Sequence, residues 1–152
     1  MATGSHAGNT ICFNWLASAI ILISILESLL AGFGIIPPIL SYSPANLFFA
    51  FLRIAIVVYA GWAYAASGLA RAALRGGALF LASSLAICIS VSALPGIATR
   101  PILGVFAPEG SLPALFATIL VENTLVGAAL AAAVAWLSQK KLFRKILPSK
   151  KN

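Results

Sequence analysis

Three ionisable side chains lie inside long apolar stretches of this 152-residue sequence. They are Glu27 in ILISILESLLAGFG, Arg53 in FAFLRIAIVVYAG and Glu122 in TILVENTLVG. The chain has only three acidic residues, and two of them, Glu27 and Glu122, lie in segments whose other side chains are almost all apolar. A charged side chain at the centre of a bilayer costs about 2.5–3.5 kcal/mol on insertion-based scales. We therefore expect these side chains to face the interior of a protein and to pair.

The two carboxylates and the single guanidinium do not balance. If Arg53 pairs with one glutamate, the other must take up a proton or bind a cation, because burial disfavours an uncompensated charge. We expect Glu27, Arg53 and Glu122, with Asn123, to form one intramembrane charge cluster, all within roughly 7 Å of the membrane midplane at about 1.5 Å of rise per residue. Such a cluster could exchange a proton or cation, or it could fix helix packing and dock against a partner's charge.

Composition identifies the elements that must position this cluster. Apolar residues make up 61% of the chain and charged residues 9%, and the mean hydropathy is +1.04. Soluble domains carry about 25% charged residues, so a soluble fold is excluded. Four segments have the roughly 20 apolar residues that one membrane crossing needs: residues 15–36, 47–69, 78–97 and 112–137. The sequence predicts an all-α integral membrane protein, a four-transmembrane-helix bundle.

Flanking and connecting segments complete the predicted organisation. Residues 1–10 are expected to be disordered, residues 11–139 to form the transmembrane domain, and residues 140–152 to form a basic cytoplasmic tail. Prolines in IPPILSYSPAN predict a turn after the first span. The two glycines of RAALRGG predict a tight hairpin between the second and third spans.

Basic residues are concentrated at two places. Six of the ten Lys and Arg residues lie in the last thirteen positions, and two more in RAALR. Cytoplasmic flanks of membrane spans carry such an excess, so four spans predict both termini in the cytoplasm of a multi-pass plasma-membrane (cell-membrane) protein. We expect Lys140, Lys141, Arg144 and Lys145 to contact anionic lipid headgroups. The location of the charge argues against nucleic-acid binding.

Small and polar residues recur at helical spacing along the predicted spans, which favours close helix packing. Ser24 and Ser28 flank Glu27 and, with Tyr64, form a possible polar lining. The full stripes are Ser24, Glu27, Ser28, Ala31 and Gly34; Arg53, Val57, Ala60, Gly61, Tyr64 and Gly68; Ser83, Ser84, Ser90 and Ser92; and Gly127, Ala131 and Ala135.

No residue pattern predicts catalysis. The sequence has no GxSxG, HExxH, CxxC or phosphate-loop motif, no Asp, and one histidine, His6. Cys12 and Cys88 have no metal-ligand spacing. We expect no enzyme activity, no cofactor and no metal site.

The favoured interpretation is a non-catalytic integral membrane subunit of a larger membrane assembly, in which the Glu/Arg cluster serves helix docking. The partners would be the lipid bilayer and other membrane subunits or further copies of the chain. The alternative is a small oligomeric proton- or cation-coupled transporter or channel that uses Glu27 or Glu122. A third possibility is an adaptor whose basic tail recruits cytoplasmic partners or acidic lipid.

Overall fold

A computed structural model of the chain describes residues 4–41, 43–93 and 112–146, and these residues form helices and turns without any strand. The four long helices are α1 (Gly4–Gly32), α2 (Pro44–Ala63), α3 (Leu69–Ala93) and α4 (Leu112–Ile146), with short 3-10 helices η1 (Ile39–Ser41) and η2 (Ala65–Ser67). Each long helix contains a stretch long and apolar enough to cross a membrane: Cys12–Gly32, Pro44–Ala63, Leu69–Ala93 and Pro113–Lys140. The predicted fold class is confirmed.

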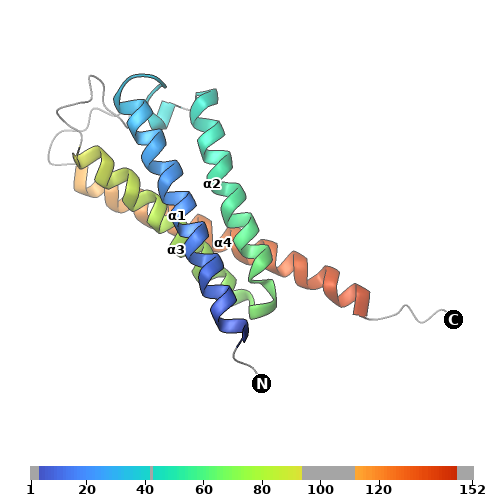
Figure 1. Cartoon of the computed structure of the whole chain (residues 1–152). Helices are drawn as coiled ribbons and strands as arrows, with labels where there is room; N and C mark the ends of the chain where they lie inside the picture. The colour runs from blue at the N-terminus through green and yellow to red at the C-terminus, as the bar shows by residue number, and fades with distance from the viewer. Residues whose placement is uncertain (1–3, 42, 94–111, 147–152) are drawn as a thin grey trace.

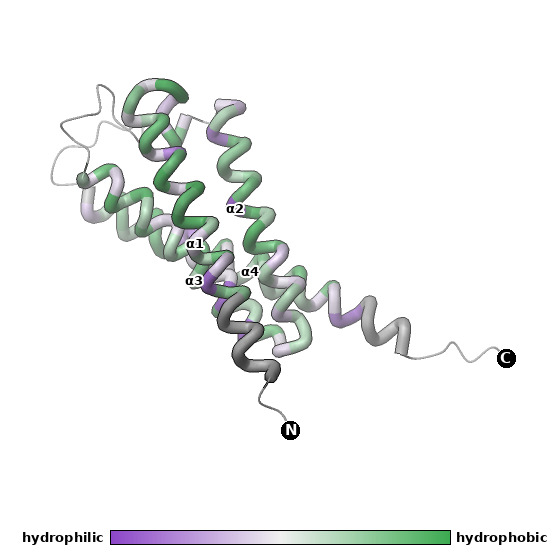
Figure 2. The backbone as a smooth tube through the Cα atoms, viewed as in Figure 1, coloured by the Kyte–Doolittle hydropathy of each residue, from purple (hydrophilic) through white to green (hydrophobic). Residues whose placement is uncertain are grey.

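The helices are arranged as two antiparallel pairs (Figure 1). α1 and α2 lie on one side, and the α3–α4 pair crosses behind them. The start of α1 and the end of α4 point toward the same end of the bundle, and the last turns of α4 continue well beyond the other helices. Hydrophobic residues dominate all four helices, and hydrophilic positions are sparse (Figure 2).

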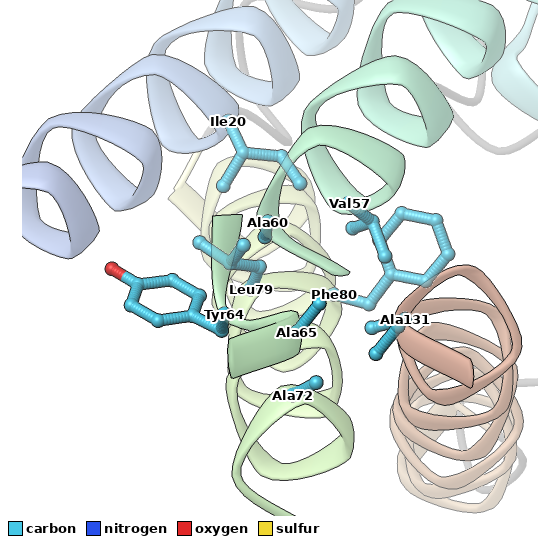
Figure 3. Packing of buried hydrophobic residues seen from close by; sticks show 10 residues of the cluster. Ile20, Val57, Ala60, Tyr64, Ala65, Ala72, Leu79, Phe80 and Ala131 are labelled. Carbon is cyan, nitrogen blue, oxygen red and sulfur yellow. The ribbon is translucent and has the colours of Figure 1, made fainter. Parts of the chain in front are cut away.

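Buried apolar side chains from all four helices meet at the centre of the bundle (Figure 3). Ile20 of α1, Val57 of α2 and Leu79 of α3 are completely inaccessible to solvent, as is Ala131 of α4. In a bilayer this core gains little from the hydrophobic effect, because lipid tails are as apolar as leucine. Close van der Waals packing must therefore hold the helices together.

Glycines provide the closest of these contacts. A Cβ atom added to Gly76 of α3 would lie 2.4 Å from the carbonyl oxygen of Gly127 on α4, and one added to Gly61 of α2 would lie 2.7 Å from the carbonyl oxygen of Ala131. Ala131 and Ala135 are fully buried. The small-residue ridge predicted on the fourth span is therefore confirmed as a packing surface between α4 and its neighbours.

The predicted hairpin at RAALRGG is wrong. This segment lies within α3, and the chain turns earlier, through η2 and Gly68, whose φ of 100° suits a residue without a side chain. Ala, Leu and Arg are strong helix formers, and the two glycines are needed at the helix crossing instead. The Gln139 side chain of α4 donates a hydrogen bond to the Ala65 carbonyl, at 2.7 Å, and ties α4 to this turn.

The other boundaries follow the sequence more closely. Ser43 caps α2 by accepting a hydrogen bond from the Asn46 N–H, and Pro44 occupies its first turn, as the predicted proline turn requires. Helix α1 begins at Gly4, which corrects the expectation of disorder up to residue 10: once a helix is nucleated, each added residue gains a hydrogen bond. The connector between the third and fourth spans lies outside the described residues.

The glycine contact can be tested with two adjacent substitutions. We expect Gly76→Ala to destabilise the bundle by about 1–3 kcal/mol, because its new methyl group overlaps backbone atoms that cannot move cheaply. Gly77→Ala is the matched control: its Cβ would lie 3.3 Å from the nearest atom, a tight but tolerable contact. Loss of helicity during titration with a denaturing detergent measures the unfolding free energy of both variants. Equal effects of the two substitutions would contradict this account of the crossing.

Candidate functional site

The structure brings Glu27 and Arg53 together as an ion pair inside the membrane-spanning region. The Arg53 guanidinium donates a hydrogen bond from Nη1 to Oε2 of Glu27. Glu27 is completely buried, and the Arg53 side chain is 13% exposed. The pair joins α1 to α2, so each charge is compensated by the neighbouring helix, as a low-dielectric environment demands.

One oxygen of Glu27 remains without a partner. Oε1 is buried and accepts no hydrogen bond from any residue in the described ranges. The adjacent serines do not reach it: Ser24 and Ser28 donate to the carbonyl oxygens of Ile20 and Ser24, at 2.8 and 2.9 Å. A buried acceptor of this kind is costly unless a proton, a cation or another donor satisfies it. Glu27 is therefore the side chain at which binding of a proton or a cation is physically reasonable.

Ser24 also links α1 to α3. Its Oγ lies 2.7 Å from Oγ of Ser83, within hydrogen-bonding distance. The stripe predicted on the first span is thus buried in the bundle, with Ser24 bonded to α3 and Glu27 to α2, apart from Gly34, which lies beyond the end of α1 with a φ of 71°. The stripe serves packing and helix–helix hydrogen bonding beside the ion pair.

Glu122 does not join the cluster, and the expectation that three ionisable groups converge is wrong. Its side chain is exposed on the outer surface of α4. The next residue, Asn123, faces the bundle and donates from Nδ2 to Oγ of Ser84 on α3, at 2.8 Å. Successive helical residues point about 100° apart. Because α4 turns its face at Gly127 toward α3, Asn123 is directed inward and Glu122 outward.

Tyr64 lies away from the ion pair. Tyr64 is the residue directly after the end of α2, about 16 Å along the helix axis from Arg53 at 1.5 Å per residue. Its ring is buried and stacks against Arg75 of α3, whose guanidinium carbon lies 4.8 Å from the Tyr64 ring centroid and 4.5 Å from that of Phe13. Tyr64 thus takes part in a cation–π contact that joins α1, the α2–α3 turn and α3.

A cavity of about 340 Å³ lies next to the ion pair, between α2, α3 and α4. No sequence pattern predicts this cavity, because it depends on how the helices diverge. Most of its walls are apolar, and its polar lining consists of Asn46, Arg53, Ser83, Ser84 and Asn123. Glu122 is not among its lining residues. The cavity and the ion pair together form the candidate site.

The basic positions after the fourth span begin on a continuous helix. α4 runs to Ile146 and so includes positions 140, 141, 144 and 145. Lys140 is exposed, and its Nζ lies 3.6 Å from the ring centroid of Trp136. The side chains of Lys141, Arg144 and Lys145 lie outside the described part of the chain.

Within the described ranges, no three His, Cys, Asp or Glu side chains gather as a metal site, and Cys12 and Cys88 are both free thiols. Comparison with known proteins finds no matching family model, no similar curated protein and no similar solved structure.

The ion pair makes a prediction for stability. Removing one member leaves the other charge buried and uncompensated, so we expect Arg53→Met to cost about 3–5 kcal/mol of unfolding free energy. Adding Glu27→Leu to the same chain should recover most of this loss, because two apolar side chains of similar volume need no partner. Unfolding in mixed micelles, followed by circular dichroism, measures the cycle. Arg71→Met, at an exposed position, is the control, and additive effects of the two substitutions would refute the coupling.

Proposed function

We propose that this protein is a non-catalytic membrane subunit that docks a partner through the outer face of α4. The observation that carries the proposal is the exposed carboxylate of Glu122, about 13 Å along the helix from the start of the span at Pro113. Intramembrane ionisable residues ordinarily face a protein interior or a water-filled cavity. An acidic side chain on the outer surface of this bundle therefore supports a neighbouring protein at that place.

The surface around Glu122 is suited to helix packing. Its exposed residues include Val121, Glu122, Leu125, Ala129, Ala133 and Trp136. Ala129 and Ala133 are four residues apart and present a small-xxx-small surface, which allows a second backbone to approach closely. This face is distinct from the ridge at Gly127, which is already occupied by α3.

The charge of Glu122 favours an unlike partner over a second copy of the chain. A matching surface from another copy would place two carboxylates near each other, and Arg53 is already paired with Glu27. A transmembrane helix that carries Lys or Arg at the same depth would neutralise Glu122 and satisfy its oxygens. We therefore propose a heteromeric assembly whose partner supplies a basic residue.

Site-specific photo-cross-linking tests the docking face. A photoreactive residue at Ala133 should form adducts with an unlike chain in native membranes, whereas the same residue at exposed Ile89 of α3 should not. Glu122→Leu should reduce the Ala133 adduct at least fivefold without changing the stability of the isolated protein, since Glu122 is exposed on α4 and forms no ion pair with any described residue. Adducts with copies of this chain alone, or adducts insensitive to Glu122→Leu, would contradict the proposal.

A second candidate function rests on the unpartnered oxygen of Glu27. A buried carboxyl with one free oxygen, beside a cavity lined by Arg53, could load and release a proton or cation, so the chain could be a small coupled carrier. In this candidate function, Glu27 and not Glu122 is the carboxyl that binds and releases the proton or cation.

Flux measurements separate the two candidates. In proteoliposomes, the carrier requires that Glu27→Gln abolish proton- or cation-coupled flux, because an amide cannot exchange a proton, while Glu122→Gln leaves the flux unchanged. Equal flux from wild-type protein, the Glu27→Gln variant and empty liposomes would eliminate the carrier.

The orientation in the membrane belongs to the same proposal. Trp15, Trp62 and Trp136 are all exposed and lie toward the end of the bundle where α1 begins and α4 finishes, as do Arg71 and Lys140. Interfacial tryptophans and basic flanks are typical of the cytoplasmic boundary. We propose that this end lies on the cytoplasmic side of the cell membrane, with the basic positions of α4 against anionic headgroups.

A further inference from the structure

The cavity beside the ion pair opens toward the membrane. Leu47 and Ile54 of α2 and Val126 of α4 line it, and all three side chains are exposed on the apolar surface of the bundle. In Figure 1, α2 diverges from the α3–α4 pair toward the end where α2 begins. A molecule dissolved in the bilayer could therefore enter between α2 and α4 without crossing water. The volume of the cavity lies at the small end of the range for small-molecule sites.

Hydrogen-bond donors are in excess at the inner part of the cavity. A guanidinium carries five N–H groups, and Arg53 gives one of them to Glu27. Among the residues that the structure describes, Glu27 alone accepts a hydrogen bond from the Arg53 side chain. Asn123 also lines the cavity; its Nδ2 donates one N–H to Ser84 and has a second N–H to offer. These groups favour a ligand with an acceptor oxygen.

Asn46 lines the cavity at a second level along α2. Asn46 is 4% exposed, and its Nδ2 donates to the carbonyl of Pro38, at 2.6 Å, and to Oγ of Ser41, at 3.1 Å. Its Oδ1 is buried and, among the described residues, has no hydrogen-bond partner. Asn46 precedes Arg53 by two helical turns, about 10 Å along α2.

Charge balance determines the kind of head group. Glu27 already compensates Arg53, so a carboxylate or phosphate in the cavity would add an unbalanced negative charge within the membrane. A carbonyl oxygen accepts the free N–H groups without that cost. We infer that the cavity binds a neutral, membrane-soluble molecule with a carbonyl-bearing head and a hydrocarbon tail. A quinone and a neutral glyceride share this chemistry.

Equilibrium binding to the full-length protein in neutral detergent micelles tests the inference. The labelled probes are a decyl-substituted benzoquinone and 1-monoolein, with oleate as the anionic comparison. We expect saturable binding of at least one neutral probe and at least tenfold weaker binding of oleate. The neutral probe that binds more tightly identifies the ligand source. No saturable binding of either neutral probe, or equally tight binding of oleate, would overturn the inference.

Two matched pairs of variants place the probe in the cavity. Ala50→Phe fills it and should weaken binding at least tenfold, whereas Ala55→Phe, on the exposed side of the same helix, should change it less than twofold. Asn123→Leu should also weaken binding, while Asn14→Leu, at an exposed position on α1, should not. If the phenylalanine variant does not fold, the asparagine pair decides. Equal binding within both pairs would place the probe elsewhere and refute the site.

Discussion

The contact between Gly76 and Gly127 sets the rotation of α4, and the remaining features of the site depend on that rotation. Because backbone meets backbone there, α4 can present only one face to α3. With this face fixed, Asn123 is directed toward α3 and the cavity, and Glu122 toward the lipid. A rotation of one residue position, about 100°, would exchange the two environments. The small side chains therefore determine which polar group is internal and which is available to a neighbour.

The two intramembrane glutamates illustrate two ways of accommodating an acid in a bilayer. Glu27 is compensated within the chain by Arg53, and this pair holds α1 to α2 at a level where packing alone offers modest attraction. Glu122 has no such compensation among the described residues and is directed outward. Within the described spans, Arg53 is the one guanidinium that pairs with a carboxylate, so we expect the second compensation to come from outside the bundle or from a proton. This shortage of one positive charge supports the subunit proposal.

Much of the fold could be predicted from the sequence because the relevant signals are local. Apolar length predicted the four helices, and the spacing of Gly127, Ala131 and Ala135 predicted a packing ridge. The association of Arg53 with a glutamate followed from the cost of an isolated charge in lipid. The α2–α3 turn was misplaced because glycines serve both in hairpins and at helix crossings, and no local pattern at Gly76 distinguishes the two uses.

The position of Glu122 and the cavity could not be predicted for a different reason. The ridge at Gly127 predicted one packing face of α4, but Ala129 and Ala133 form a second small-residue face on the side of Glu122, so the sequence does not show whether that side is covered within the bundle. The cavity depends on the divergence of α2 from α3 and α4, which is a property of the assembled bundle. Asn46, which lines the cavity, has the sequence features of an ordinary residue at the start of a helix.

The continuity of α4 has a mechanical consequence. A single rigid rod carries Glu122 on its outer side, Asn123 on its inner side and the basic residue Lys140 near its far end. An unbroken helix transmits twist along its axis, so torque applied at Glu122 or Lys140 reaches the backbone contact between Gly76 and Gly127 and is resisted there. Engagement of a neighbour, or attachment of the basic end to a charged surface, would therefore load this contact and leave the cavity beside Arg53 unchanged in shape.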